Sequence, residues 1–223
     1  MISEEDKQLK YERALEYEIF VKGEYDFAKE KIQNARCVFD IWWHIWLFSQ
    51  WCKLINSKVE IHYFEPIVEF YDKAINILWN DKNIILNNRW IGSELGRWLL
   101  FLNEEKTMQS SKFLSFLNSK WIKKDVSFIT LKDYLIKNNV DKIDVMKMDI
   151  EWMEFEVLSS RWVFEWKRVG SLVVEIHLLD DKMKSDWNQL FIKIRKIFGN
   201  VEIIKSRYCE EIFLVWCCDN LIS

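Results

Sequence analysis

Four side chains that can take up a proton lie at or next to the carboxyl ends of the predicted strands 143–150 and 171–177. They are Asp149 and Glu151 at the end of the first strand, and Glu175 and His177 at the end of the second. Carboxylates and imidazole carry most general acid–base catalysis, and the ordinary pKa of histidine, about 6.5, suits His177 best. The alternative is a structural, hydrogen-bonding role for His177. Such a cluster can also hold a divalent cation, but the chain lacks HExxH and every other metal-motif spacing, so we predict no metal site.

Two further carboxylates stand at the ends of earlier strands. Asp40 lies at the end of the apolar run 37–41, and Glu65 follows the run 59–64. Taken singly, Asp40 is explained equally well as a charge at a helix amino terminus, and Glu65 as a turn residue before Pro66. Because ligands of open α/β sheets bind at the carboxyl ends of the strands, their joint placement favours one binding site.

Strands and helices alternate along the chain, which is typical of a mostly parallel sheet covered by helices on both faces. The predicted strands are 37–41, 59–64, 83–87, 143–150 and 171–177, with 201–206 and 211–216 as a closing hairpin. The predicted helices are 3–34, 47–56, 67–78, 130–139, 153–161 and 185–198, and 92–102 is expected to form a turn and an edge strand. We expect an N-terminal helical extension, residues 1–35, followed by one domain, residues 36–223.

The overall composition is that of an ordinary globular protein. Half of the residues are hydrophobic, 30% are charged, and the net charge of -3 argues against a general nucleic-acid binder. No apolar run approaches the ~20 residues that span a bilayer, and the charged N-terminus lacks the apolar core of a signal peptide. The five cysteines show no CxxC spacing and are interpreted as reduced thiols. We therefore expect a cytoplasmic protein without a membrane span or a nucleic-acid partner.

Tryptophan and glycine occur in unusual numbers. The chain has 13 Trp and 5 Gly, whereas ordinary usage would give roughly 16 glycines at this length. Many of the tryptophans stand in turns or directly after predicted helices, where glycine is preferred; these positions are 42, 43, 46, 79, 90, 98, 121, 152, 162 and 166. A bulky residue in the left-handed region costs about 1–2 kcal/mol, so we expect backbone strain there if the tryptophans are genuine.

We hypothesise that these tryptophans misreport glycines. Some bacterial lineages read the UGA codon as glycine and others read it as tryptophan, so translation with the wrong code would print Trp at some glycine positions. Trp51, Trp187 and Trp216 lie inside predicted helices or strands and are interpreted as true tryptophans. The alternative is a genuine Trp-rich protein whose indoles form an aromatic surface for sugars or cations.

With glycine at these positions, the sequence resembles the FkbM family of S-adenosylmethionine-dependent methyltransferases. The matching stretches are VFDIWWHIWLFS, HYFEP, SFITLKDYL, IDVMKMDIEWMEFEVL and SLVVEIH, in the family's order between residues 36 and 178. The tryptophans fall on the family's glycines. The resemblance implies an α/β, Rossmann-like class I methyltransferase fold. Its central sheet would be mostly parallel and seven-stranded, with helices on both faces and a C-terminal antiparallel hairpin.

The resemblance also implies where the cofactor, S-adenosyl-L-methionine, binds. Asp40 would accept a hydrogen bond from the amine of its methionine part, Glu65 would bind both ribose hydroxyls, and Asp149 would face the cofactor or the substrate. The other implied positions are Trp42, Trp43, His44 and Trp46 in the loop beneath the cofactor, and Asn88 and Trp90 near the adenine.

The implied activity is O-methylation of a hydroxyl on a sugar, a glycan or another small molecule. If the tryptophans are genuine, indoles at 42, 43 and 46 would fill the cofactor pocket. The protein would then be a catalytically inactive methyltransferase-like fold that acts as a binding module. The N-terminal helix and residues 103–125 are expected to shape the acceptor pocket, and the sequence carries no information on the oligomeric state.

Overall fold

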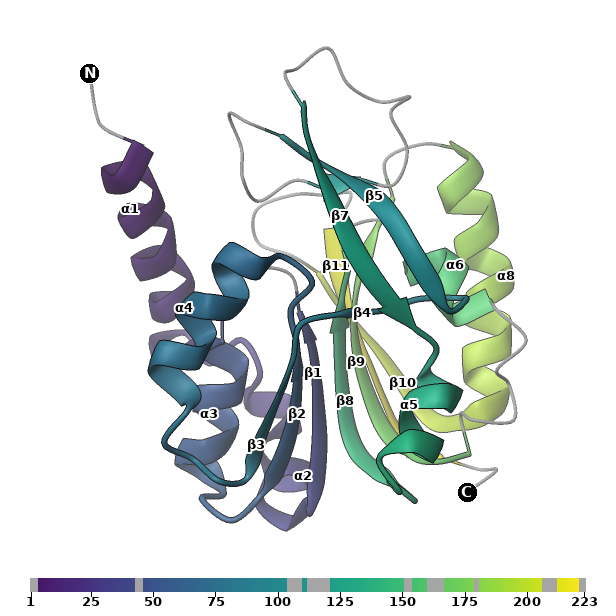
Figure 1. The fold of residues 1–223 in the computed structure, drawn as a ribbon. Coiled ribbons are helices and arrows are strands. Elements are labelled where there is room, and N and C mark those ends of the chain that lie inside the picture. The colour runs from purple at the N-terminus through teal and green to yellow at the C-terminus, as the bar shows by residue number, and fades with distance from the viewer. Residues whose placement is uncertain are drawn as a thin grey trace.

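A seven-stranded β-sheet runs through the centre of the molecule, with helices on both of its faces (Figure 1). The strand order is β10-β11-β9-β8-β1-β2-β3. β1, β2, β3, β8 and β9 run parallel, whereas β11 is antiparallel to both β9 and β10. The predicted Rossmann-like methyltransferase fold, with its C-terminal antiparallel hairpin, is therefore confirmed.

The computed structural model describes residues 4–42, 46–103, 110–111, 121–150, 154–159, 167–178, 181–205 and 212–220. The central strands are β1 (Cys37–Trp42), β2 (Glu60–Phe64), β3 (Ile84–Asn87), β8 (Ile143–Asp149), β9 (Val169–His177), β10 (Phe198–Lys205) and β11 (Ile212–Asn220). The helices are α1 (Glu4–Glu16), the π-helix η1 (Tyr17–Val21), the 3-10 helix η2 (Asp26–Ala28), α2 (Lys29–Asn34), α3 (Leu47–Ile55), α4 (Val68–Leu78), α5 (Leu131–Lys137), α6 (Glu154–Ser159) and α8 (Asp181–Ile197). Among these described helices, none combines the length and the apolar character needed to cross a bilayer.

The predicted central strands and their helices are all present, with two differences. The helix predicted at 3–34 is interrupted, because Gly23 adopts a φ of 68°, a left-handed conformation that ends a helical run. The last helix begins at Asp181 rather than at 185. Its first turn is exposed and polar, so the apolar period that marks the buried part of the helix starts only at Trp187.

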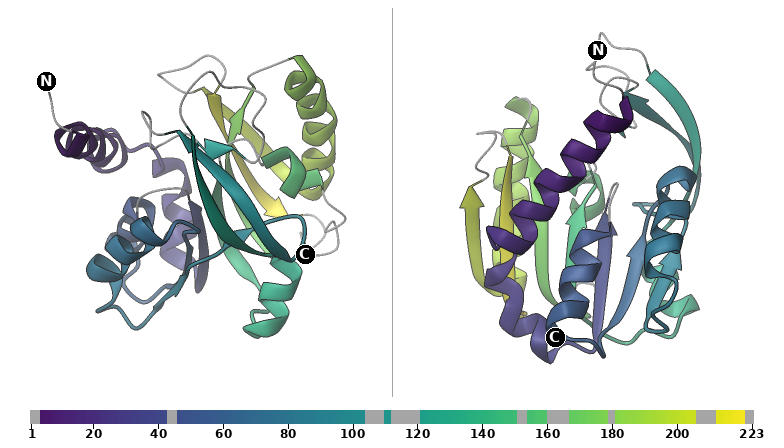
Figure 2. Two further views of the ribbon diagram at one scale, coloured as in Figure 1. Left: turned by 45° about the horizontal axis from the view of Figure 1, so that its top comes forward. Right: turned by 90° about the vertical axis from the view of Figure 1, so that its left-hand side faces the viewer.

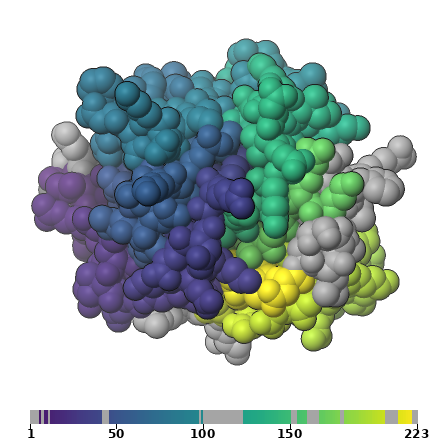
Figure 3. All heavy atoms as spheres, turned by 90° about the horizontal axis from the view of Figure 1, so that it is seen from below, coloured from purple at the N-terminus to yellow at the C-terminus, as the bar shows by residue number. Residues whose placement is uncertain are grey.

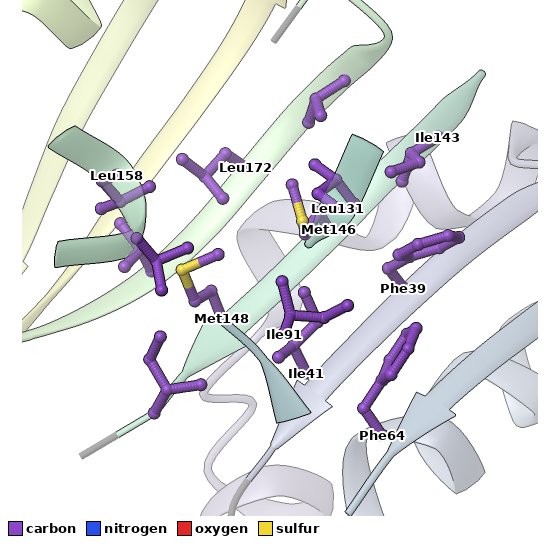
Figure 4. Packing of buried hydrophobic residues seen from close by; sticks show 14 of the residues in the cluster. Phe39, Ile41, Phe64, Ile91, Leu131, Ile143, Met146, Met148, Leu158 and Leu172 are labelled. Carbon is purple, nitrogen blue, oxygen red and sulfur yellow. The ribbon is translucent and has the colours of Figure 1, made fainter. Parts of the chain in front are cut away.

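The two faces of the sheet carry separate hydrophobic clusters, because successive side chains of a strand point to opposite faces. One face, which includes Phe39, Ile41 and Met146, packs against α5, α6 and α8 (Figure 4). The opposite face, which includes Val38 and Val145, packs against the N-terminal segment, α3 and α4. Figure 2 shows these helices in front of the sheet in its right-hand view.

The helices bury single stripes of apolar residues. α8 buries Trp187, Leu190 and Ile194 at helical spacing, and α3 buries Trp51 and Cys52 among others. Burial of a large apolar side chain contributes about 1.5–3 kcal/mol. Trp51 and Trp187 are therefore core residues, as their interpretation as true tryptophans requires.

A second, four-stranded sheet was only partly predicted. Its strands are β4 (Trp90–Ile91), β5 (Gly96–Asn103), β6 (Ser110–Ser111) and β7 (Trp121–Ile129), in the order β4-β7-β5-β6. β5 and β7 form a long antiparallel pair that rises above the carboxyl ends of β1, β2 and β8 (Figures 1 and 2). Residues 92–102 do contain a strand, as expected, but β7 was not predicted from the sequence. The polar run Lys123–Asp125 interrupts its apolar pattern.

The N-terminal segment packs against the central sheet. Its buried residues in the α3-side cluster are Ile19, Tyr25, Ala28 and Ile32. Nζ of Lys31 lies 3.1 Å from Oδ1 of Asp219, and Figure 3 shows dark purple residues of this segment beside the yellow C-terminal strand. A domain boundary between residues 35 and 36 stays a prediction.

The start of α5 gives a test of the local structure. Oγ1 of Thr130 accepts a hydrogen bond from the backbone N–H of Asp133 at 3.0 Å, so Thr130 is the N-cap of this helix. Thr130→Ala should lower the free energy of unfolding by about 1 kcal/mol, because the N–H loses its partner. Chemical denaturation measures this change. Thr130→Ser keeps the hydroxyl and should change stability much less; an equal loss in both variants would contradict a capping role.

Candidate active site

The carboxyl ends of β1, β8 and β9 bring the predicted polar residues together. In the register of the parallel strands β1 and β8, Asp40 lies beside Lys147. Asp149 lies two residues further along β8, beside Trp42. The register of β8 with β9 ends with Met148 beside Val174, so Asp149 and Glu175 are the next residues of the two strands, and His177 follows two residues later on the same face. One face of the sheet therefore carries these side chains at a common edge.

Asp40 is fully buried at the end of β1. Its Oδ2 accepts a hydrogen bond from the hydroxyl of Ser49 in α3 at 2.5 Å, whereas its Oδ1 is a buried acceptor with no hydrogen-bond partner among the described residues. Burial raises the pKa of the Asp40 carboxyl to about 6, although the Lys147 ammonium and the Ser49 hydroxyl act in the opposite direction. A buried acceptor without a donor costs free energy, so this oxygen is suited to receive a ligand donor.

The raised pKa of Asp40 predicts a pH dependence of cofactor binding. An ammonium group binds the ionised carboxylate, and Asp40 is ionised only above about pH 6. Affinity for S-adenosylmethionine should therefore rise with pH through about 6 and level off near 7, and below 6 it should fall up to about tenfold per pH unit. Calorimetric titrations between about pH 5 and 8 measure the affinity for S-adenosylmethionine at each pH. Asp40→Asn should bind weakly and without this step; an unchanged step in that variant would assign it to another group.

Asp149, Glu175 and His177 form a compact cluster. One ligand atom of each residue lies within 4.8 Å of those of the other two. Nδ1 of His177 lies 3.2 Å from Oε1 of Glu154, and Nε2 lies 3.8 Å from Oε1 of Glu175. Asp149, Glu154 and His177 are buried, whereas 24% of the Glu175 side chain is exposed. The structure thus brings together three of the four predicted catalytic residues; Glu151 lies outside the described residues.

Sequence reasoning missed three residues of this site. Glu154 is fully buried in the first turn of α6, and Nζ of the buried Lys147 lies 3.4 Å from Oδ2 of Asp149. The ring of Tyr25, from the N-terminal segment, lies 5.9 Å from the same Nζ. Burial raises the pKa of the Tyr25 hydroxyl well above its usual value, and the Glu175 carboxylate adds to the shift. A charged residue inside an apolar strand, such as Lys147, was the signal that could have indicated a buried ion pair.

The residues expected around the ribose and adenine lie at the ends of β2 and β3. Glu65 is fully buried, and its Oε1 accepts a hydrogen bond from the backbone N–H of Ile67 at 2.6 Å. Nδ2 of Asn88 donates to the backbone carbonyl of Glu65 at 3.0 Å, so this amide holds the turn that follows β2. Trp90 is buried in β4, where its ring stacks on that of Phe128 at a centroid distance of 5.8 Å. Contacts of these residues with a cofactor stay predictions.

The described tryptophans do not adopt the left-handed conformation. Trp79 ends α4 with φ -59° and ψ -24°, and Trp46 precedes α3 with φ -76° and ψ 6°. Among the non-glycine residues that the structure describes, only Asn139 and Asp219 have a positive φ. The expectation of backbone strain at Trp46 and Trp79 was therefore wrong, because Trp79 has helical angles and Trp46 combines a negative φ with a ψ near 0°, a conformation outside the left-handed region. The same holds at Trp90, which lies in a strand.

The loop expected beneath the cofactor is described only in part. Outside the described residues lie Trp43, His44, Glu151, Trp152, Trp162 and Trp166. Only the backbone is described for Trp42, in β1, and for Trp98 and Trp121, in β5 and β7. The Trp46 indole is 9% exposed and belongs to the hydrophobic cluster of α3. A pocket filled by indoles at 42 and 43 stays a prediction, as does the UGA hypothesis.

Comparison with known proteins supports the fold and gives a family. Residues 46–205 match the family described as Methyltransferase FkbM domain. A structure described as a putative rRNA-methylase from Clostridium thermocellum has a TM-score of 0.52 and 10% identity over 90% of this chain and 96% of that chain. Fibrillarin from Aeropyrum pernix, with natively bound S-adenosyl-L-methionine, is more weakly similar, and its TM-score of 0.44 and 10% identity over 82% of this chain and 66% of that chain are too low to support the fold.

One curated protein also matches in sequence. It is Transcription-associated protein 1 of Drosophila melanogaster, 23% identical in an alignment 203 residues long. The alignment covers 70% of this chain and only 5% of that protein. The family match, in contrast, covers well over half of the chain, from α3 to the end of β10. The chain therefore belongs to the FkbM family of methyltransferases, whose methyl donor is S-adenosylmethionine.

Proposed function

We propose that this protein transfers the methyl group of S-adenosylmethionine to a hydroxyl oxygen of a small molecule or glycan. One observation carries the proposal: Asp149, Glu175 and His177 lie together at the carboxyl ends of β8 and β9, with Glu154 beside His177. Ligands of α/β sheets bind at this edge. A hydroxyl nucleophile must lose its proton during the reaction, and a cluster of proton acceptors suits that need.

Asp40 and Glu65 suit the polar ends of the cofactor. Both carboxylates are buried at the ends of the neighbouring strands β1 and β2. Oδ1 of Asp40 has no hydrogen-bond partner among the described residues, and an ammonium donor would satisfy it. A carboxylate at the end of the next strand is the group that binds ribose hydroxyls in related nucleotide sites. We assign the amine to Asp40 and the ribose to Glu65.

The chemical step follows from these positions. When bound, S-adenosylmethionine supplies a methyl group on a positively charged sulfur. The acceptor oxygen must be held in line with the sulfur–carbon bond. The oxygen–carbon bond forms while the sulfur–carbon bond breaks with its electron pair returning to sulfur, and the hydroxyl proton leaves through the cluster. Glu154 orients the imidazole of His177, and the partly exposed Glu175 connects the cluster to solvent.

The proposal is tested by following S-adenosylhomocysteine formation with a panel of acceptors. The full chain is incubated with S-adenosylmethionine and with sugars, hydroxy acids, simple amines or RNA, and products are measured by mass spectrometry. We expect turnover with a hydroxyl acceptor and a mass increase of one methyl group on oxygen. Turnover only with amines or RNA, or none with any hydroxyl acceptor, would contradict it.

A second function is favoured by the backbone of the described tryptophans. Trp46 and Trp79 have negative φ angles and Trp90 lies in a strand, so genuine tryptophans fit these positions without left-handed strain. If the indoles at 42 and 43 are also genuine and occupy the cofactor loop, the chain would bind ligands at this edge without turnover. Titration of S-adenosylmethionine into the chain with Trp42→Gly and Trp43→Gly, compared with the parent chain, separates the two functions.

A further inference from the structure

We infer that Asp149, Glu175 and His177 bind a divalent cation, and that this cation holds the acceptor through two neighbouring oxygen atoms. The inference rests on the proposed function, because it assigns a substrate class to the same site. The three ligand atoms lie within 4.8 Å of one another. Ligands of Mg²⁺ lie about 2.1 Å from the ion, so two of them are at most about 4.2 Å apart. A small rotation of the partly exposed Glu175 side chain closes this difference.

The sheet itself builds the ligand set. Asp149 and Glu175 are neighbours on parallel strands, and Glu175 and His177 are separated by one residue, so all three side chains share a face. Because the strands are hydrogen-bonded on both sides, the Cα positions of the three ligands are fixed before any ligand binds. Preorganised ligands lower the cost of closing a metal site.

Glu154 gives His177 the surroundings of a metal ligand. Oε1 of its fully buried carboxylate lies 3.2 Å from Nδ1 of His177. Because a carboxylate accepts hydrogen bonds, Nδ1 carries the hydrogen and donates a hydrogen bond to Oε1. Nε2 then presents its lone pair on the side of Glu175, whose Oε1 is 3.8 Å away, beyond hydrogen-bond distance. Metal-binding histidines commonly donate their second ring N–H to a carboxylate in this way.

The charge of the site favours a cation. The described residues place four carboxyl groups around this edge, those of Asp40, Asp149, Glu154 and Glu175, and a single buried ammonium, that of Lys147. Asp149, Glu154 and Lys147 are nearly inaccessible to water, so their charges are weakly screened. A divalent cation between Asp149 and Glu175 reduces the mutual repulsion of the acids.

The ligand types indicate the ion and its substrate. Two carboxylate oxygens and one imidazole nitrogen suit Mn²⁺ or Mg²⁺ better than soft, thiolate-preferring ions. An octahedral ion with three protein ligands keeps three positions open, and two adjacent ones can chelate a pair of oxygens on the acceptor. The substrate class is therefore a vicinal diol or an α-hydroxy acid, and sugars provide the former. The prediction of no metal site depended on the spacing of ligands along the sequence. Spacing cannot identify a site whose ligands come from two separate strands, β8 and β9.

Manganese binding to the full chain tests the inference. The protein is treated with EDTA, dialysed, and titrated with Mn²⁺ alone, with bound and free ion distinguished by electron paramagnetic resonance. We expect one Mn²⁺ per chain that Mg²⁺ displaces. Glu175→Gln removes one charged ligand and should weaken binding at least tenfold, and Glu154→Gln should weaken it about 10- to 100-fold through the imidazole. No bound ion at millimolar Mn²⁺, or the parent affinity for Mn²⁺ in both variants, would overturn the inference.

The chain offers a matched control at the opposite end of the sheet. Cys37, Glu60 and His62 form a second cluster whose ligand atoms also lie within 4.8 Å of one another. There, however, both ring nitrogens of His62 already have partners, the Tyr134 hydroxyl at 2.8 Å and Oε1 of Glu60 at 3.0 Å. Glu60→Gln should leave Mn²⁺ affinity unchanged. A loss in Glu60→Gln together with an unaltered Glu175→Gln would place the ion at the wrong end of the sheet.

The same experiments separate this inference from the proposed function. Methyl transfer to a diol by EDTA-treated protein, with no gain on adding Mn²⁺, would refute the cation and keep the hydroxyl acceptor. Stoichiometric Mn²⁺ binding without methyl transfer to any hydroxyl compound would refute the proposed function and keep the cation site. Turnover with a vicinal diol but not with the matching mono-alcohol is the result that the inference predicts.

Discussion

Replacing His177 by alanine is expected to lower the rate of methyl transfer by about 10²–10⁴-fold, the range for loss of a positioned acid–base group or its equivalent. The imidazole is buried at the centre of the cluster, between Glu154 at 3.2 Å and Glu175 at 3.8 Å. Its removal takes away one of the three clustered side chains on which the proposed reaction depends. S-adenosylhomocysteine formation at saturating cofactor and acceptor measures the rate.

The His177→Ala result is meaningful only if the fold and the cofactor site survive. The melting temperature and the affinity for S-adenosylhomocysteine should stay close to those of the parent chain, because Asp40 and Glu65 are untouched. Lys182→Ala, at an exposed position of α8, serves as a surface control and should retain the parent rate. A His177→Ala chain that turns over at the parent rate would remove the cluster from the reaction.

Replacing Trp42 and Trp43 by glycine is expected to raise the affinity for S-adenosylmethionine at least about tenfold, which corresponds to roughly 1.4 kcal/mol. The resemblance to the family implies that the cofactor lies over this loop, where the backbone would approach the ligand and a side chain would stand in its place. β1 ends at Trp42, beside Asp149, so position 42 adjoins the polar edge of the sheet. Calorimetric titration of both chains gives the two dissociation constants.

Trp79→Gly is the matched control for this variant. Trp79 is 66% exposed at the end of α4, and its helical angles do not call for glycine. The replacement should leave cofactor affinity unchanged. The gene provides an independent test: UGA codons at 42, 43, 46 and 152, with UGG at 51 or 187, would support recoded glycines. UGG at every tryptophan, or tighter binding in neither variant, would favour the binding module.

The central sheet was predictable because its parallel strands are buried on both faces. Such strands appear in a sequence as mostly apolar runs, as in residues 171–176, and the helices between them show a regular apolar spacing. β7 was not predictable in this way. Its charged residues Lys123 and Lys124 break the apolar pattern, and its pairing with β5 depends on contacts between segments that are distant along the chain.

The site was predictable only where a strand end marks it. Asp40, Asp149 and Glu175 were identified because each lies at the end of an apolar run. Glu154 was missed because its contact with His177 depends on how α6 sits over the sheet, which local sequence does not encode. The expectation of strain at the tryptophans was wrong for a related reason, since a turn signal in the sequence does not specify the sign of φ.

The most direct test of the account is to locate the cofactor on the chain. The Trp42→Gly, Trp43→Gly protein is irradiated with ultraviolet light in the presence of methyl-labelled S-adenosylmethionine, digested, and mapped by mass spectrometry. The account predicts label on peptides from 37–50 and 59–66, and its loss in Asp40→Asn. Label confined to the groove at the other end of the molecule, lined by Phe20, Lys53 and Leu78 among others, would contradict it.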